Sequence, residues 1–298
     1  MHAGVGLLEG TMRKVVGACV CALAIVLLTH PGHAEEACSS NALGVSRTIE
    51  IDTTGGPWFG APEGDPGFLQ PGEVVLTFDD GPAPGSTDAI LAALAAECTK
   101  ATFFVVGEMA AAHPEIVRAI DAQGHTIGTH TWSHRNLKRL SDANMVVQIE
   151  SAFTVAEASA GHPVAPFFRY PYLSYSHASA AYLQGRNIAQ FAVDIDPFDW
   201  RTRNVQTVVR RVSTGLDRHG KGIILLHDIH PSTAAAVPAI LALLKQKNFK
   251  VVHLTAKTTA QTIATYPPPS KEPRYTVASR RSVAHSKPWL TEWKWPAW

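Results

Sequence analysis

The chain has 298 residues, of which 17% are charged, and its formal net charge is +1. A chain of this length can bury a sizeable core, in one large α/β domain or in two smaller ones. The near-neutral charge indicates neither a nucleic-acid-binding surface nor a strongly acidic partner, so composition predicts a globular protein that binds no nucleic acid.

The N-terminal segment 1–34 has the pattern of a signal peptide. Two basic residues precede an apolar run over 15–28, and the stretch "THPGHA" leads from this run to Ala34. The run is shorter than the ~20 residues that a membrane-spanning helix needs, which favours a cleaved peptide over a permanent anchor. We expect cleavage after Ala34 and export to the periplasm or the extracellular space. Met12, directly before the basic pair, is a candidate for the true start.

The four cysteines divide at this cleavage site. Cys19 and Cys21 leave with the signal peptide, whereas Cys38 and Cys98 remain. In an oxidising compartment the two remaining thiols could form one disulfide. Two unpaired thiols are equally compatible with the sequence, because it does not give the distance between their Cα atoms.

Residues 35–72 separate the signal peptide from the first buried strand. The stretch "SRTIEI" predicts one short strand, and the Gly/Pro-rich residues after it predict a loop. We expect this segment to form a rim or lid beside the main domain.

Over residues 73–265, apolar β-type runs alternate with helical patterns. Segments such as "STDAILAALAAE" and "PEIVRAIDAQG" carry apolar residues at intervals of three and four, as amphipathic helices do. Repeated βα units predict parallel strands with crossover helices, which leaves a doubly wound sheet or a (β/α) barrel of seven or eight units. We expect the strands at 73–79, 101–106, 125–129, 165–170, 189–194, 221–227 and 250–254.

The composition changes at residue 266. The segment 266–298 holds six Lys and Arg residues against two Glu residues and is rich in Pro and Ser. Such a composition predicts disorder. Its tryptophans could contact a membrane or a cell-wall glycan, and the alternative is a free end without a partner; they are Trp289, Trp293, Trp295 and Trp298.

Five of the seven predicted strands end in polar residues. In chain order these stretches read "TFDDGP", "HTWSH", "RYPY", "DIDPFDW" and "LLHD". In a barrel the C-terminal strand ends meet at one mouth, whereas an open sheet spreads them along an edge. The distribution therefore favours the barrel.

The same stretches predict a metal site. His130 and His134 are four residues apart, which on a helical turn would place both imidazoles on one face. Asp79 and Asp80 end a buried strand without a nearby Lys or Arg, so they need a cation from elsewhere. The two imidazoles and the Asp80 carboxylate would leave positions for water and substrate on Zn²⁺, or on Co²⁺, Ni²⁺ or Mn²⁺. Taken alone, the histidine pair would more often lie on the surface.

The remaining polar residues indicate a base and an acid. Asp79 could act as general base, held ionised by a bidentate contact with Arg169. His227 follows the buried run "GIILL" and would protonate a leaving group if Asp199 keeps the imidazole charged. The alternatives are a surface charge for Arg169 and a buried structural imidazole for His227.

Taken in order, the five motifs resemble those of the polysaccharide deacetylases, the NodB-homology domain of carbohydrate esterase family 4. The resemblance covers residues 73–255, and five motifs in one order are far more specific than any one of them. It implies a distorted (β/α) barrel. It also implies metal-dependent removal of an acetyl group from an N-acetylated, or sometimes an O-acetylated, sugar.

The resemblance implies a role for each matching residue at the metal. Asp79 would be the base, and Arg169 would orient it. The metal ligands would be Asp80, His130 and His134.

The resemblance also implies an acid opposite the base. Asp199 would tune His227, which would act as the acid. In this motif Asp194 and Asp196 compete for the contact with His227, and we choose Asp199 because it directly precedes Trp200.

The substrate pocket is implied by the third, fourth and fifth motifs. Tyr172 would donate its backbone N–H to the oxyanion, and the pocket would be lined by Pro171, Trp200 and Leu225. Many relatives read Arg-Pro-Pro-Tyr-Gly in the third motif, and here Tyr170 and Leu173 replace the first Pro and the Gly. We expect this change to alter the wall of the substrate groove.

We therefore expect an exported deacetylase that uses a metal-activated water to hydrolyse the acetamide of an N-acetylated glycan, such as peptidoglycan or a chitin-like polymer. One alternative is a related metal hydrolase that acts on a non-glycan amide, or an esterase that removes O-acetyl groups from xylan. A non-catalytic glycan-binding protein ranks third, because neither the base nor any ligand is missing. The absence of a Gly-x-Ser-x-Gly elbow from the sequence argues against a serine hydrolase.

Overall fold

The computed structural model describes residues 38–62, 67–261 and 266. The described strands are β1 (Arg47–Ile51), β2 (Trp58–Phe59), β3 (Glu73–Asp79), β4 (Thr102–Val105), β5 (Thr126–Thr129), β6 (Phe167–Phe168), β7 (Ala189–Phe191), β8 (Gly222–His227) and β9 (Lys250–Ala256). The described α-helices are α1 (Ser86–Ala96), α2 (Gly107–Ala112), α3 (Pro114–Ala122), α4 (Asp142–Ala160), α5 (His177–Gly185), α6 (Val205–His219) and α7 (Pro231–Gln246). Short 3₁₀ turns are η1 (Leu137–Arg139), η2 (Pro171–Leu173) and η3 (Asp199–Arg201).

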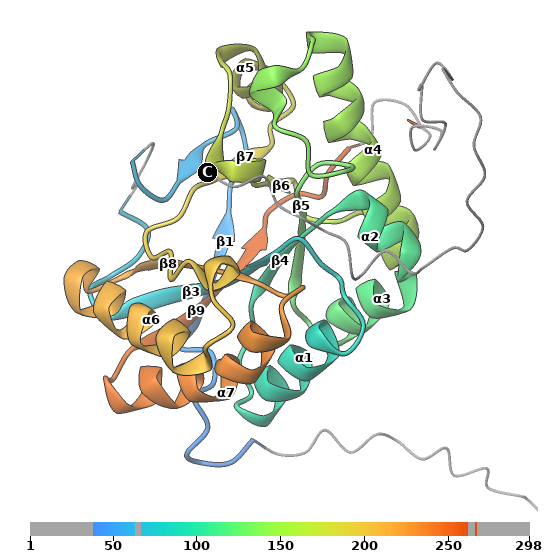
Figure 1. Cartoon of the computed structure of the whole chain (residues 1–298). Coiled ribbons are helices and arrows are strands. Elements are labelled where there is room, and N and C mark those ends of the chain that lie inside the picture. The colour runs from blue at the N-terminus through green and yellow to red at the C-terminus, as the bar shows by residue number, and fades with distance from the viewer. Residues whose placement is uncertain (1–37, 63–66, 262–265, 267–298) are drawn as a thin grey trace, which may run out of the picture. The chain divides into compact units, whose positions relative to one another are not determined.

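Six strands form a closed parallel ring. Neighbouring strands pair in the order β8, β3, β4, β5, β6, β7. A single bridge between Ile195, just after β7, and Ile224 in β8 closes the ring. Figure 1 shows α1 to α4, α6 and α7 around the outside of these strands. The predicted barrel is confirmed, and its distortion lies at the single bridge.

Strand β9 lies outside this ring and crosses it at the N-terminal ends of its strands. β9 pairs with Glu73 and Val74 at the start of β3, while β4 takes the same edge of β3 further along. His253 of β9 then lies 3.0 Å, Nε2 to Oγ1, from Thr126 at the start of β5. β1 pairs along the outer edge of β9. The N-terminal ends of the ring strands are thereby covered, and the C-terminal ends form the mouth.

The alternation of side chains in β3 decides which residues face the ring interior. All seven residues of this strand are buried. Val74, Leu76 and Phe78 pack in the outer core against the helices, whereas Val75 belongs to the inner core. Because strand side chains alternate, Asp79 faces the interior as Val75 does. The strand therefore ends with a carboxylate that points into the barrel.

Helix α6 illustrates how the sequence sets the outer layer. The Asn204 side chain accepts a hydrogen bond from the Thr207 backbone N–H and caps the helix start. Val208, Val212 and Leu216, at intervals of four, are the buried residues of the helix. The helix ends at Gly220, whose φ of 67° suits glycine.

The predicted strand bounds differ from the structure where the strands meet the mouth. The prediction for β3 is confirmed at both ends, but β6 and β7 are only two and three residues long. Their C-terminal residues leave the ladder to build the site loops. β2, which pairs with β7, lies in a segment predicted to be a loop, because two residues carry no readable periodicity.

The predicted signal peptide lies outside the described residues, as does all of the basic tail except Tyr266. Within the described part, residues 38–62 supply β1 and β2. None of the described helices combines the length and the apolar character needed to cross a membrane.

Cys38 and Cys98 form a disulfide, with 5.9 Å between their Cα atoms. This settles the alternative that the sequence left open. The bond joins the start of the described chain to the end of α1. Nearby, the Leu43 backbone N–H donates to Oε2 of Glu97 at 2.8 Å, and the Gly44 N–H donates to the Glu97 carbonyl at 2.8 Å.

We predict that the disulfide contributes substantially to stability. It closes a loop with a sequence separation of 60 residues, which restricts the unfolded chain. Replacing both residues (Cys38→Ser with Cys98→Ser) should lower the free energy of unfolding by about 2–5 kcal/mol, measured by urea denaturation. A reductant should destabilise the wild-type protein and leave the double variant unchanged; an equal response of both proteins would contradict the prediction.

Candidate active site

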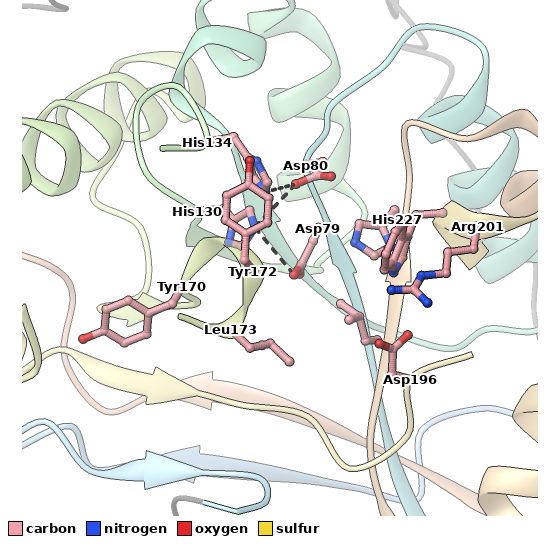
Figure 2. A pocket seen from close by; sticks show the side chains of 12 residues that line it. Asp79, Asp80, His130, His134, Tyr170, Tyr172, Leu173, Asp196, Arg201 and His227 are labelled. Atoms are coloured by element: carbon pink, nitrogen blue, oxygen red, sulfur yellow. Dashed lines mark ion pairs between the residues drawn. The ribbon is translucent and has the colours of Figure 1, made fainter. Parts of the chain in front are cut away.

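Asp79 and Asp80 lie at the end of β3 and line one pocket at the mouth of the barrel. In a continued strand these neighbours would point to opposite faces. Asp80 instead has a φ of 79°, in the left-handed region that non-glycine residues rarely adopt. The chain turns at this residue, and both carboxylates face the pocket (Figure 2).

His130 and His134 follow β5 in a loop. The expected helical turn is wrong, because Thr131 and His134 have φ values of 67° and 52°, which a right-handed helix excludes. The loop nevertheless brings the two rings to 5.0 Å between centroids. The spacing of four residues therefore gives the expected proximity through a different backbone path.

The Asp80, His130 and His134 side chains match the geometry of a metal site. Nε2 of His130 and Nε2 of His134 lie 3.4 Å and 3.2 Å from Oδ1 of Asp80. Two ligands at ~2.1 Å from a tetrahedral ion lie about 3.4 Å apart. The three ligand atoms lie within 4.8 Å of one another and all three residues are buried. This set fits one divalent ion.

Two further observations support the metal site. The buried Asp80 carboxylate has no hydrogen-bond partner on either oxygen, which is costly unless a cation compensates it. Nδ1 of His130 lies 2.7 Å from the Arg169 carbonyl, so this nitrogen donates and Nε2 is left as the acceptor. Burial lowers the pKa of His130 to about 3, and the neutral ring keeps its lone pair for a metal.

Asp79 is held by a buried arginine. Nη1 of Arg169 donates to Oδ1 of Asp79 at 2.8 Å and to Oγ1 of Thr77 at 2.7 Å. Nε and Nη2 donate to the Phe191 and Ala192 carbonyls. The contact with Asp79 is thus made by one nitrogen. The expected bidentate contact is wrong, because the other two nitrogens bind the last residue of β7 and the residue after it. The alternative of a surface charge is also wrong, since Arg169 is fully buried.

The second oxygen of Asp79 faces the metal site. Oδ2 lies 3.9 Å from Nε2 of His130, one of the three candidate ligands. Burial raises the pKa of Asp79 to about 6, although the charges of Arg169 and His227 act to lower it. Asp79 therefore has one fixed oxygen and one oxygen directed toward the place where a water would be activated.

Asp199, rather than Asp194 or Asp196, contacts His227. Its Oδ1 lies 2.7 Å from Nδ1 of His227, and its Oδ2 accepts from the His227 backbone N–H at 2.8 Å. The Thr233 hydroxyl donates to Oδ2 at 2.7 Å. Burial alone would lower the pKa of His227, but the charge and hydrogen bond of Asp199 outweigh it and raise the pKa to about 10. His227 is therefore charged at neutral pH.

The two other aspartates of this motif have different partners. Asp194 accepts from the Ala61 and Ile223 backbone N–H groups. Asp196 accepts from the Phe198 N–H at 2.7 Å and lines the pocket.

The pocket wall consists mainly of the residues that the motifs supplied. Tyr172, Trp200 and Leu225 line it, whereas Pro171 is buried beside it and is not part of the lining. Tyr172 has a φ of 60°, and its ring packs edge-on to His134 at 4.7 Å between centroids. Figure 2 shows Tyr172 over the histidines and His227 on the other side of Asp79.

The two residues that depart from the third motif, Tyr170 and Leu173, contribute differently to the pocket wall. Tyr170 touches the pocket, but it is buried, and its hydroxyl donates to Oε1 of Gln190 at 2.7 Å. Its ring stacks on Trp58 at 5.7 Å. Leu173 is 41% exposed and lines the pocket. The altered groove wall is therefore presented by Leu173.

Sequence reasoning missed several residues of this region. Arg201 lines the pocket and was not predicted, and Asp196 lines it although the sequence raised this residue only as a partner for His227. Asp228 and Thr87 lie buried behind the Asp79–Asp80 turn. The signal for Asp228 was its place directly after His227 in "LLHD", but a buried hydrogen bond to a distant turn has no sequence pattern.

Comparison with known proteins identifies the same family and the same fold. The family model described as polysaccharide deacetylase matches residues 69–189. The chain is 34% identical over 180 residues to the peptidoglycan-N-acetylmuramic acid deacetylase PdaC of Bacillus subtilis strain 168. This match covers 60% of the chain but only 37% of PdaC, so the chain spans little more than a third of that relative's length.

Two further relatives match over more of their length. The chain is 33% identical to a chitooligosaccharide deacetylase of Azorhizobium caulinodans, over 55% of the chain and 77% of the relative. The solved structure of the Bdellovibrio bacteriovorus peptidoglycan deacetylase Bd3279 superposes with a TM-score of 0.66 and 32% identity, covering 74% of this chain and 62% of that chain. The chain belongs to the polysaccharide deacetylase family.

Proposed function

We propose that the protein is a metal-dependent deacetylase that hydrolyses the acetamide of an N-acetylated glycan and releases acetate. The observation that carries the proposal is the cluster of Asp80, His130 and His134, with Asp79 and His227 lining the same pocket. A divalent ion held by this cluster would supply Lewis-acid chemistry toward a water and toward the acetamide carbonyl. Imidazole and carboxylate ligands suit Zn²⁺, which we propose first, while Co²⁺, Ni²⁺ and Mn²⁺ remain compatible.

Asp79 is proposed as the general base. Arg169 fixes Oδ1, and Oδ2 lies beside the candidate ligands. A carboxylate whose pKa burial raises to about 6 is a better proton acceptor than an exposed one and is still ionised at neutral pH. Asp79 would take the proton from the attacking water.

His227 is proposed as the general acid. Asp199 holds Nδ1, so Nε2–H is directed away from Asp199 and can donate to the departing amine nitrogen. The Tyr172 backbone N–H would donate to the oxyanion. Trp200 and Leu225 both line the pocket. We propose that they contact the acetyl methyl group.

Peptidoglycan and chitin-like polymers are the proposed substrates, since the named relatives include deacetylases of peptidoglycan and of chitooligosaccharides. Both polymers are built from N-acetylated amino sugars. The disulfide is consistent with a protein that folds outside the reducing cytosol, where these glycans occur. We propose periplasmic or extracellular localisation.

A substrate panel tests the function. Acetate release should be measured on peptidoglycan, chitooligosaccharides and acetylated xylan, with Zn²⁺ or Co²⁺ added and with a chelator as control. We expect metal-dependent acetate from at least one of the two N-acetylated glycans. Release from xylan alone would favour an O-acetyl esterase, and no release from any of the three would favour a binding protein or a non-glycan amide substrate.

Substitution of Asp79 should largely abolish activity, whereas substitution of Asp80 should weaken metal binding. Asp79→Asn should lower acetate release by about 100-fold or more and leave the bound metal unchanged, because it removes the base but no ligand. Asp80→Asn or His134→Ala should lower the bound metal, measured by elemental analysis of the purified protein. An active Asp79→Asn enzyme would overturn the assignment of the base.

The Asp199 carboxylate should set the alkaline limit of activity. Asp199→Asn removes the charge that raises the pKa of His227 while the burial that lowers it remains. The alkaline limb of the kcat profile should therefore move to lower pH. In the wild type, the pair should stabilise the fold fully below the ordinary histidine pKa of ~6.5 and lose this contribution as pH rises toward 10.

Urea denaturation across the same pH range provides a second measurement for this pair. The wild-type protein should lose stability between neutral pH and about pH 10, whereas Asp199→Asn should show a flatter profile. If the alkaline limbs of the two kcat profiles coincide, and the free energies of unfolding depend on pH equally in both proteins, Asp199 does not control the pKa of His227.

A further inference from the structure

We infer that Asp228 is a positioning residue that holds the turn of the metal ligand Asp80. Asp228 lies at the end of β8, 1% exposed, and does not line the pocket. It is not one of the three candidate metal ligands. The inference rests on the proposed metal site and is independent of which glycan is hydrolysed.

Asp228 binds the backbone on both sides of Asp80. Its backbone N–H donates to the carbonyl of Asp79 at 3.2 Å. Its Oδ1 accepts from the backbone N–H of Gly81 at 2.8 Å. The residue before the ligand and the residue after it are therefore fixed by one amino acid.

The second carboxylate oxygen extends this contact to helix α1. Oγ1 of Thr87 donates to Oδ2 of Asp228 at 2.7 Å and accepts from the Ala83 backbone N–H at 2.8 Å. All of these groups are buried. The turn is thus hydrogen-bonded to the first turn of α1 through Asp228 and Thr87.

The conformation of Asp80 explains why such support is needed. A non-glycine residue in the left-handed region costs on the order of 1–3 kcal/mol and persists only where the surroundings enforce it. The Asp80 carboxylate itself accepts no hydrogen bond, so its direction depends on its backbone and on a bound metal. Without Asp228, the turn could relax and move Oδ1 of Asp80 away from the histidine nitrogens.

Close packing at the neighbouring glycine supports the same conclusion. A Cβ atom at Gly81 would lie 2.0 Å from Oδ2 of Asp228, so only glycine allows the carboxylate to approach this backbone. Asp228 also follows His227, which is opposite Asp79 in the β3–β8 register. The same residue therefore links the metal side of the pocket to the proposed acid.

A purely structural role is the alternative, and the chain offers a matched control. Asp194 also accepts two backbone N–H groups, from Ala61 at 3.0 Å and from Ile223 at 2.7 Å. It also packs against a glycine, since a Cβ atom at Gly222 would lie 2.5 Å from Cβ of Asp194. None of these contacts involves the Asp79–Gly81 turn.

The test compares Asp228→Ala with Asp194→Ala by Zn²⁺ affinity, measured by competition with a chromophoric chelator. Loss of a group that orients a ligand typically weakens metal binding by ~10–100-fold, which we expect for Asp228→Ala. Asp194→Ala should bind Zn²⁺ within about twofold of the wild type, because it shares no partner with the ligands. The visible absorption of the Co²⁺-loaded protein should change only in Asp228→Ala.

Two milder variants separate positioning from folding. Asp228→Asn keeps an oxygen for the Gly81 N–H and should recover most of the affinity lost in Asp228→Ala. Thr87→Val removes the hydroxyl that fixes Oδ2 and should weaken Zn²⁺ binding even if Asp228→Ala does not fold. The inference would be overturned if folded Asp228→Ala bound Zn²⁺ with wild-type affinity and had an unchanged Co²⁺ spectrum. If Asp228→Ala is insoluble, the same result in Thr87→Val would overturn it. Failure of the wild-type protein to bind either ion would instead reject the proposed metal site itself.

Discussion

The ion pair between Arg169 and Asp79 is the interaction on which the site depends. Two carboxylates are buried side by side, and burial of one charge is tolerable only with a compensating partner. Arg169 compensates Asp79 at 2.8 Å, whereas the oxygens of Asp80 accept no hydrogen bond and fit a metal ion together with the two histidines. The guanidinium also donates to Thr77, to the last residue of β7 and to the residue after it, and these contacts hold it beside Asp79. This fixed pairing gives two identical side chains different chemistry.

The barrel provides the common end at which these groups meet. Parallel strands place their C-terminal residues at one mouth, and β3, β5, β6 and β8 each lead into one of the groups around the pocket. Strand alternation directs Asp79 inward, and the left-handed turn at Asp80 brings the second carboxylate to the same pocket. Position on the strand fixes the first residue, whereas the turn after the strand fixes the second.

The sequence predicts the part of this arrangement that follows from periodicity. Buried runs such as Glu73–Asp79 identify strands, and the order of the motifs assembles their end residues into one candidate site. It does not predict the loop conformations, because Thr131 and His134 have positive φ values, which non-glycine residues rarely adopt. For the same reason the single contact of Arg169, the pairing of β2 and the buried Asp228 are visible only in three dimensions.

The crossing of β9 beneath the ring limits how a polymer can approach. The interior is filled by Val75, Phe104, Phe167, Phe191 and Ile223, and Val252 and Leu254 of β9 pack in the same core. Because the interior is packed, the proposed glycan substrate would lie across the mouth and could not thread through the barrel. In this geometry the site would not require the end of a polymer. Under the proposed function, a sugar in the middle of a strand would therefore be as accessible to the site as a terminal one.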